Sequence, residues 1–362
     1  MHMRSSLLKT VLIAGVLFSQ AVVAQDAKEL YNTATNFMRS GDYSNAVLVL
    51  NQALQLEPDN FEFRKQLGFT FYLKGDLNKA KNVIEPLLGK KEADVQVFQI
   101  AGNIYQGRDE WKTAQRMYEK AIRKFPNSGE LYNDNGTLLM NFKMYDGALR
   151  SWIKGIEQDP AFPGNYYNAT KTYYYSNDPL WCILYGETFM NMESFTTRTA
   201  EIRNILLESY KKLFNDPSLF DSMVPEEEGK KGRKGNKSSS DFVQAFKQSI
   251  GKQMSVITGG VDLDALIMVR TRFILDWYNF QGAKFPYALF DLQRRMLREG
   301  MFESYNQWLF GPAINQANYT GWITLHKQDY DAFQQFQRNH PLKPRPDEYY
   351  NDGKFTLVNA GY

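Results

Sequence analysis

The residue types that most often carry catalysis are scarce in this chain of 362 residues. It contains three histidines, at His2, His326 and His340, and a single cysteine, Cys182. A cysteine nucleophile needs a base beside it, and no histidine lies between His2 and His326. We therefore interpret Cys182 as a small buried hydrophobic residue, and one cysteine allows no intramolecular disulfide.

A glycine- and lysine-rich stretch, GKKGRKGNKS, superficially matches a phosphate-binding loop. That motif requires Gly-Lys directly before Ser or Thr, after a strand. Here Asn236 separates Gly235 from Lys237, and the preceding segment has helical spacing, so we reject this interpretation. The wider segment, residues 224–240, has no apolar residue after Val224. It is predicted to be a solvated, disordered loop, and a weak contact with an anionic lipid or polymer stays open.

Other sequence patterns that carry chemistry do not occur. Metal-ligand spacings, a nucleophile elbow and a dinucleotide fingerprint are all absent from the sequence, and the carboxylates fall at ordinary surface positions of predicted helices. We therefore predict no catalytic residue, no metal site and no cofactor, in a protein that is not an enzyme. A hydrolase with an unrecognised site in the last third of the chain stays as an alternative. The net charge of +3 gives no reason to expect a nucleic-acid partner.

The first 24 residues have the layout of a secretory signal peptide. Basic residues (Arg4 and Lys9) come first, the apolar run VLIAGVLF follows, and small residues (Val22 and Ala24) precede a cleavage site. The run is short for a bilayer, which takes about 20 apolar residues, and no later segment is long and apolar enough. We expect cleavage after Ala24, a mature protein that does not span a membrane, and a periplasmic or secreted location.

From residue 27 onward, residue types recur with a period of 34. Four consecutive frames, residues 27–60, 61–94, 95–128 and 129–162, share small residues at positions 8 and 20 and large ones at 11, 17 and 24. Glycine stands at position 15 in the first two frames, and proline at position 32 in the first, third and fourth. The pattern is carried by Gly41, Tyr43, Ala46, Leu50 and Pro58 in the first frame, Gly68, Gly75 and Ala80 in the second, Gly102, Ala114 and Pro126 in the third, and Gly136, Ala148 and Pro160 in the fourth.

This pattern resembles the tetratricopeptide repeat family, clearly over residues 27–162 and more weakly over 163–196. Small residues at positions 8 and 20 let two helices approach, glycine makes the turn between them, and proline ends the second helix. Each helical hairpin leaves an apolar face that the next repeat covers. The resemblance implies an all-α fold, a right-handed superhelical α-solenoid of helix–turn–helix repeats with a divergent helical C-terminal region. Pro86 predicts a local irregularity near Glu85.

The expected domain plan has four parts after the signal peptide. Residues 25–215 form the repeat solenoid, 216–240 the disordered charged loop, 241–340 a divergent helical region that continues or caps the solenoid, and 341–362 an extended tail. Helices are predicted at 241–256, 261–280 and 327–339, and Arg270 interrupts the apolar stripe of the second. Residues 286–311 match the repeat frame through Gly300, Phe302 and Leu309, but Gln293 and Tyr305 replace the small residues at positions 8 and 20. We expect a splayed helix pair there.

Family resemblance also places a partner-binding groove on the first helices of the repeats. Its side chains are rich in aromatic rings and amides and poor in charge, which suits an extended peptide. The alternative is that the aromatic residues pack against the C-terminal helices, which then fill the groove. The predicted groove residues are Tyr31, Arg39, Lys65, Phe69, Tyr72, Gln99, Asn103, Asn133, Asn141, Tyr167, Lys171, Tyr174 and Tyr175.

Together these features predict an exported adaptor or scaffold that binds a peptide or protein partner. The expected setting is a cell-envelope assembly or secretion system, in the periplasm of a Gram-negative bacterium. A second hypothesis is a protein that binds an envelope glycan through the groove aromatics and the basic loop. The sequence does not specify the partner or the oligomeric state.

Overall fold

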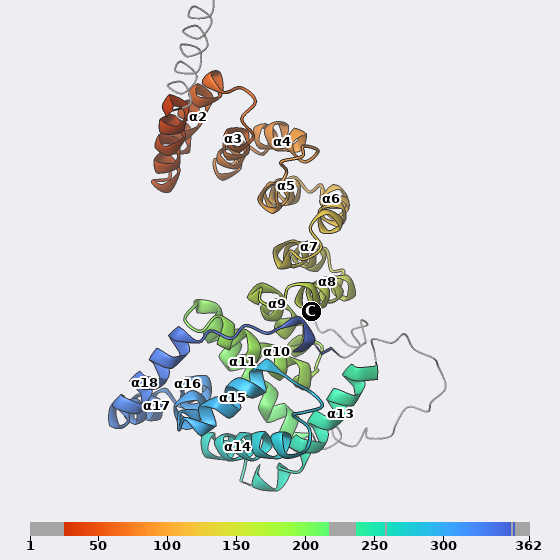
Figure 1. The fold of residues 1–362 in the computed structure, drawn as a ribbon, viewed down its shortest axis with the longest axis vertical. Helices are drawn as coiled ribbons and strands as arrows, with labels where there is room; N and C mark the ends of the chain where they lie inside the picture. The colour runs from red at the N-terminus through yellow and green to blue at the C-terminus, as the bar shows by residue number, and fades with distance from the viewer. Residues whose placement is uncertain (1–24, 217–236, 258, 349, 352–362) are drawn as a thin grey trace, which may run out of the picture. The chain divides into compact units, whose positions relative to one another are not determined.

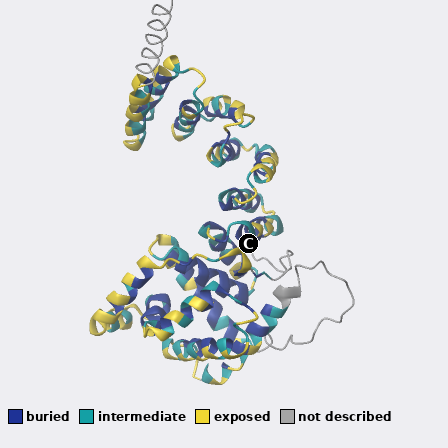
Figure 2. Cartoon of the chain, viewed as in Figure 1, coloured by how far each residue is buried: buried dark blue, intermediate teal, exposed yellow. Residues whose placement is uncertain are grey.

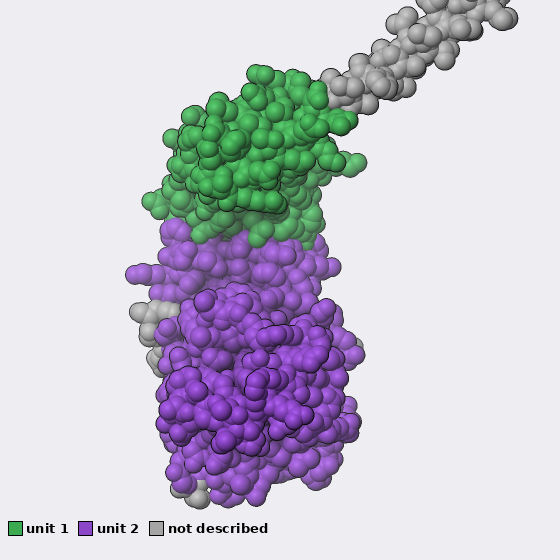
Figure 3. Space-filling model, turned by 90° about the vertical axis from the view of Figure 1, so that its left-hand side faces the viewer, with its two compact units in different colours: residues 1–125 green, residues 126–362 purple. Residues whose placement is uncertain are grey.

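The computed structural model describes residues 25–216, 237–257, 259–348 and 350–351. Within these ranges every regular element is a helix (Figure 1), so the predicted all-α fold of helical repeats is confirmed. The predicted signal peptide and residues 217–236 of the predicted loop lie outside the described residues. The helices belong to two compact units, one ending at Phe125 and the other beginning at Pro126 (Figure 3).

Unit 1 consists of three consecutive helical hairpins, which correspond to the first three sequence frames. Its helices are a first helix over residues 25–39, α2 (Tyr43–Leu56), α3 (Phe61–Leu73), α4 (Leu77–Ile84), α5 (Val95–Gly107) and α6 (Trp111–Lys124). The irregularity predicted at Pro86 is confirmed, because α4 ends at Ile84 and a 3-10 turn, η1 (Glu85–Leu87), follows it. Proline lacks the amide hydrogen that the helix would need there.

Unit 2 begins with two more hairpins, formed by α7 (Gly129–Asn141), α8 (Tyr145–Gln158), α9 (Pro163–Tyr175) and α10 (Pro179–Met192). The helix α11 (Thr197–Asn215) follows. The C-terminal helices are α13 (Lys237–Gly251), η2 (Met254–Ile257), α14 (Leu263–Phe280), α15 (Ala288–Arg298), α16 (Phe302–Ile314), α17 (Gln316–Leu325), α18 (Lys327–Asn339) and η3 (Pro346–Glu348).

Two of the sequence predictions for unit 2 are wrong in detail. The disordered loop was expected to reach residue 240, but α13 already begins at Lys237. No helix was predicted between residues 311 and 327, but α17 runs from Gln316 to Leu325 and includes Gly321. The side chain of Asn315 caps α17 by accepting a hydrogen bond from the Asn318 amide at 3.0 Å, and this cap outweighs the low helix propensity of one glycine.

The turn inside each hairpin has the same backbone conformation in both units. The residue at position 15 of the frame has a left-handed backbone conformation, with φ between 56° and 84°. These residues are Gly41, Gly75, Asp109, Lys143, Asn177 and Gly300. Around Gly300, the Met301 amide donates to the Met296 carbonyl at 2.8 Å, which satisfies an end carbonyl of α15. The pair α15–α16 therefore has the turn of the repeat, although its sequence match is incomplete.

Close helix packing inside the hairpins depends on one contact, between positions 8 and 24. A Cβ atom added at the glycine of position 8 would lie under 3.0 Å from the side chain at position 24, in the pairs Gly68–Ile84, Gly102–Tyr118 and Gly136–Trp152. In the fifth hairpin the sizes are exchanged, because Gly186 at position 24 faces Thr170 at position 8. The small residue is thus required at the contact rather than at a fixed position.

The core of unit 2 is continuous from the repeats into the C-terminal helices (Figure 2). Trp181 of α10, Phe242 of α13 and Trp277 of α14 are all buried there, and aromatic rings meet edge to face or stacked throughout. Tyr350, near the end of the chain, stacks on Phe242 with ring centroids 4.0 Å apart. The C-terminal region therefore shares one core with the last repeats.

Candidate functional site

In unit 1, two polar residues predicted to line the groove, Tyr31 and Lys65, are bonded to carboxylates of the repeats. The Tyr31 hydroxyl donates to Glu62 at 3.3 Å, and the Lys65 ammonium lies 2.9 Å from Glu62 and 2.7 Å from Asp94. Burial by itself would lower the pKa of Lys65, but the hydrogen bonds that it donates to Asp94 and Glu62 raise the pKa overall. Lys65 is 3% exposed, so its ammonium charge is paired with these two carboxylates and is not presented to a partner.

The other predicted groove residues of unit 1 are at least partly exposed. The rings of Phe69 and Tyr72 stack with centroids 6.2 Å apart. Gln99 is partly exposed, and Arg39 and Asn103 are exposed.

In unit 2, three residues of the predicted groove, Lys171, Tyr167 and Asn133, are bonded to neighbouring helices. Lys171 of α9 lies 2.8 Å from Glu201 of α11, and the Tyr167 hydroxyl donates to the same carboxylate. The guanidinium of Arg198 lies over the Tyr167 ring, 4.9 Å from its centroid. Asn133 accepts a hydrogen bond from the Asn168 amide at 2.8 Å.

Three predicted groove residues of unit 2 remain on the surface at the ends of their helices. Tyr174 and Tyr175, at the end of α9, are 37% and 46% exposed, and their rings meet edge to face at 5.3 Å. Asn141, the last residue of α7, is also exposed, and α7 and α9 pack against each other. The alternative that C-terminal helices cover the groove aromatics is therefore wrong for this tyrosine pair.

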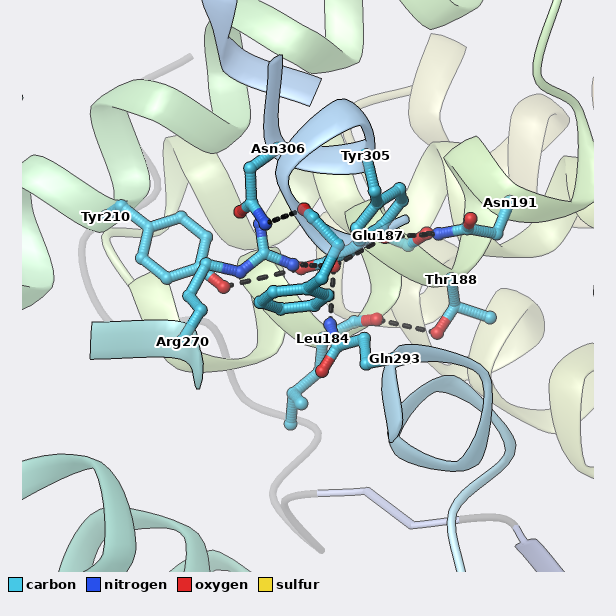
Figure 4. Close-up of polar contacts among 10 residues, drawn as sticks. Leu184, Glu187, Thr188, Asn191, Tyr210, Arg270, Gln293, Tyr305 and Asn306 are labelled. Carbon is cyan, nitrogen blue, oxygen red and sulfur yellow. Dashed lines mark hydrogen bonds and ion pairs between the residues drawn. The ribbon is translucent and has the colours of Figure 1, made fainter. Parts of the chain in front are cut away.

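A buried polar network, which the sequence analysis missed, is centred on Glu187 of α10 (Figure 4). One carboxylate oxygen accepts hydrogen bonds from the Gln293 amide at 2.5 Å, from the Tyr305 hydroxyl at 2.6 Å and from the Arg270 guanidinium. The other oxygen accepts from the Tyr210 hydroxyl at 3.3 Å. Five helices, α10, α11, α14, α15 and α16, therefore meet at one carboxylate.

The network explains three irregularities in the sequence pattern. Arg270 interrupts an apolar stripe because it pairs with Glu187. Gln293 and Tyr305 replace small residues because the carboxylate bridges them, one on α15 and one on α16. The missed signal was Glu187 itself, the one acidic residue in the otherwise largely apolar helix PLWCILYGETFMNM.

Electrostatics and burial indicate a structural role for this network. Burial by itself would lower the pKa of Arg270, but the Glu187 carboxylate raises it overall. Four aromatic rings surround the guanidinium at 5.1–5.7 Å, and Arg270 and Glu187 are 2% and 1% exposed. The ion pair is therefore closed to solvent and joins helices.

The cysteine is not a nucleophile in this structure. Cys182 is 0% exposed, and its sulfur accepts a hydrogen bond from the Ser209 hydroxyl at 3.1 Å. Burial raises the pKa of the thiol to about 12, so the thiolate is not available near neutral pH. The interpretation of Cys182 as a buried hydrophobic residue is confirmed.

Two further kinds of site, for a metal ion and for a bilayer, do not occur in the part of the chain that the structure describes. There, His, Cys, Asp and Glu side chains nowhere gather in the threes that could hold a metal ion. None of the described helices combines the length and apolar character needed to cross a bilayer.

Comparison with known proteins places the repeats in a family. The first frame and the first helix of the second match a TPR repeat over residues 31–75, and the third frame matches a tetratricopeptide repeat over residues 96–128.

Three solved structures that match part of this chain are all of low identity. PilF of Pseudomonas aeruginosa is 14% identical, with a TM-score of 0.45 over 54% of this chain and 87% of its own. TTC0263 of Thermus thermophilus is 14% identical, with a TM-score of 0.40 over 51% and 98%. YrrB, a TPR protein with an unusual peptide-binding site, is 21% identical, with a TM-score of 0.36 over 49% and 92%. On the two matched segments and the hairpin geometry, this chain is a tetratricopeptide repeat protein.

Proposed function

We propose that the protein is a non-enzymatic interaction scaffold that binds an extended segment of a protein partner at Asn141, Tyr174 and Tyr175 of unit 2. The observation that carries this proposal is the exposed tyrosine pair at the end of α9. Tyr167 and Lys171 of the same predicted groove are bonded to Glu201 of α11, whereas the side chains of Tyr174 and Tyr175 are 37% and 46% exposed. Repeat proteins of this family generally present such surfaces to protein partners.

The chemistry of the three residues supports a peptide ligand. Tyrosine combines a large apolar ring with a hydroxyl and is enriched among the residues that dominate binding energy. The side chain of Asn141 carries both a donor and an acceptor, which matches the main-chain groups of an extended peptide. A site of this kind recognises shape and main chain more than charge.

Pairwise substitution tests the site. The full chain and the double variant Tyr174→Ala, Tyr175→Ala are used to capture partners from an envelope extract, and each captured partner is then purified and titrated. We expect the double variant to lose about tenfold or more in affinity. Leu275→Ala, on α14, is the matched control, because Leu275 is 54% exposed and lies outside the predicted groove.

If the wild type and the double variant bound every captured protein with equal affinity, the proposed site at Tyr174 and Tyr175 would be contradicted. Capture of a polysaccharide, lost in the same double variant, would favour the glycan-binding hypothesis instead.

We further propose that the protein acts outside the cytoplasm, in an envelope assembly or secretion system. The support is the layout of residues 1–24, with its basic start, apolar run and small residues before Ala24. Cell fractionation combined with mass spectrometry of the mature N-terminus tests this proposal. A chain that begins at Gln25 in the periplasmic or secreted fraction is expected, and an uncleaved chain in the cytoplasm would contradict it.

A further inference from the structure

Arg203 of α11 is a partly buried arginine that is held in a fixed orientation by α16. Its Nε donates a hydrogen bond to the main-chain carbonyl of Trp308 at 3.1 Å. Its guanidinium carbon lies 5.9 Å from the centroid of the Trp308 ring. Because Trp308 is 4% exposed and belongs to the core of unit 2, this contact fixes the plane of the guanidinium fork.

The two terminal nitrogens of Arg203 have no partner among the described residues, and they are not buried. Two other partly buried cations of unit 2 pair with a carboxylate, Lys171 with Glu201 and Arg198 with Glu193. Within the described ranges no carboxylate forms an ion pair with Arg203. Burial lowers the pKa of Arg203, which is the effect of removing a cation from water without a counter-charge.

Two tyrosines, Tyr319 and Tyr330, pack on the same part of the core as Trp308, the residue that holds Arg203. Tyr319 of α17 packs against Gly311 of α16, one turn beyond Trp308, and a Cβ on Gly311 would be 2.7 Å from the Tyr319 ring. The hydroxyls of Tyr319 and Tyr330 share one hydrogen bond, so one hydroxyl hydrogen of the pair is left to donate. The rings of Trp308 and Tyr330 both lie near Phe333, with centroids 6.1 and 6.0 Å from it, which places the tyrosine pair beside the residue that holds Arg203.

We propose that Arg203, with Tyr319 and Tyr330, binds a carboxylate group of a protein partner. A guanidinium fork whose two terminal nitrogens face solvent matches the two oxygens of a carboxylate. One cation balances the single charge of this ligand. A tyrosine hydroxyl supplies a further donor at the edge of the site. The site lies on α11, α16, α17 and α18, apart from the tyrosine pair at the end of α9, so it does not depend on the proposed function.

The first experiment needs no variant. The arginine Nε–H signals of the full chain are followed by NMR while acetate is added, and the titration is repeated with acetamide, which has the same shape without the charge. We expect one saturating shift, at Arg203, with acetate and not with acetamide. Equal responses to the two probes, or a saturating shift at other arginines only, would overturn the proposal.

A substitution tests whether Arg203 is the residue that binds acetate. We expect Arg203→Gln to lose about tenfold or more in acetate affinity, because a charge-assisted bidentate contact is removed, and Tyr319→Phe to lose less. Arg294→Gln is the matched control, since Arg294 is also partly buried and lies 4.1 Å from the centroid of the Tyr278 ring. Unchanged affinity in a folded Arg203→Gln protein would refute the assignment.

A last pair of probes separates the two sources of a carboxylate in a protein. One probe is a glycine tripeptide with a free C-terminus, and the other is its C-terminal amide with an internal aspartate. Preference for the first identifies a chain terminus as the ligand, and preference for the second identifies an acidic side chain. Failure of both to bind, where acetate also fails, contradicts the site itself.

Discussion

Arg270 of α14 and Glu187 of α10 form an ion pair from which water is excluded, with 2% and 1% of the side chains exposed. Desolvating two charges is costly, and their attraction repays that cost only when the remaining polar atoms are also satisfied. Glu187 is fully used, by Gln293, Tyr305 and Tyr210. Two nitrogens of Arg270 have no partner among the described residues. The main effect of the ion pair is therefore to specify which helices pack together, and its net contribution to stability is small.

Breaking this pair on one side is expected to be more harmful than replacing both partners. We predict that Glu187→Gln or Arg270→Met lowers the free energy of unfolding by about 3–5 kcal/mol, because each leaves a buried charge uncompensated. The double variant Glu187→Leu, Arg270→Met should lose less than the sum of its two single changes. Urea unfolding followed by tryptophan fluorescence measures all of them. Strict additivity in the cycle would contradict the coupling, and Lys327→Gln, in an exposed pair with Asp331, is the control.

The ion pair between Arg198 and Glu193 predicts a pH-dependent stability. Burial by itself would raise the pKa of Glu193, but hydrogen bonds from Arg198 and Thr196 lower it overall. A carboxyl with a lowered folded-state pKa stabilises the fold above its unfolded pKa of about 4.3, and that contribution is lost as the pH falls through the folded value. We therefore expect Arg198→Gln to be less stable than the wild type at pH 7. The difference should shrink below about pH 4.

The measurement for Arg198 is the urea midpoint of both proteins at a series of pH values. A difference between the two proteins that stays constant from neutral pH into the acid range would show that Arg198 stabilises α11 through packing over Tyr167 and Phe189 and not through Glu193.

Two exposed glycines allow the repeat turn to be tested without steric effects. A Cβ at Gly300 or at Gly321 would meet no atom within 4 Å, but Gly300 has a φ of 74°. We predict that Gly300→Ala destabilises the protein by about 1–2 kcal/mol, the cost of the left-handed conformation. Gly321→Ala, inside α17, should stabilise it by up to about 1 kcal/mol. Thermal unfolding of both variants measures these changes in stability. If both substitutions stabilised or both destabilised the protein, the explanation from the left-handed turn would be wrong.

The tail residue Tyr350 provides the last prediction. Its ring stacks on Phe242, and its carbonyl accepts a hydrogen bond from the buried Tyr185 hydroxyl at 2.8 Å. We expect Tyr350→Ala to lower the free energy of unfolding by about 3 kcal/mol or more, and Tyr185→Phe by about 1 kcal/mol. Chemical denaturation measures both losses. A Tyr350→Ala protein as stable as the wild type would show that the tail does not contribute to the core.

The parts of the structure that the sequence predicted are those set by contacts between residues close along the chain. The left-handed turn at Gly41 or Gly75 and the contact of Gly68 with Ile84 arise within one hairpin, so a 34-residue pattern contains them. The same reasoning located the hairpin at Gly300 although most of its pattern is lost. The tyrosines at the end of α9 were also named from the pattern, because the exposed end of a first helix is a local property.

The network around Glu187 could not be predicted in this way. Arg270, Gln293 and Tyr305 lie 83, 106 and 118 residues from Glu187 along the chain. Periodicity showed each of them as an irregularity in its own helix, without indicating that they share a partner. Lys65 shows the same limit at shorter range, because its pairing with Asp94 removed from the surface a charge that the pattern had placed there.

The position of Tyr350 has a consequence for the order in which the protein folds during synthesis. Unit 1 ends at Phe125, so its whole sequence is available once about a third of the chain has been made. The core of unit 2 holds Trp181 and Tyr350 together, so it cannot close until Tyr350 has been made. At about 5–20 residues per second, the last repeats wait roughly ten seconds or more for their final aromatic ring. During that interval they are the part of the nascent chain that most needs a chaperone.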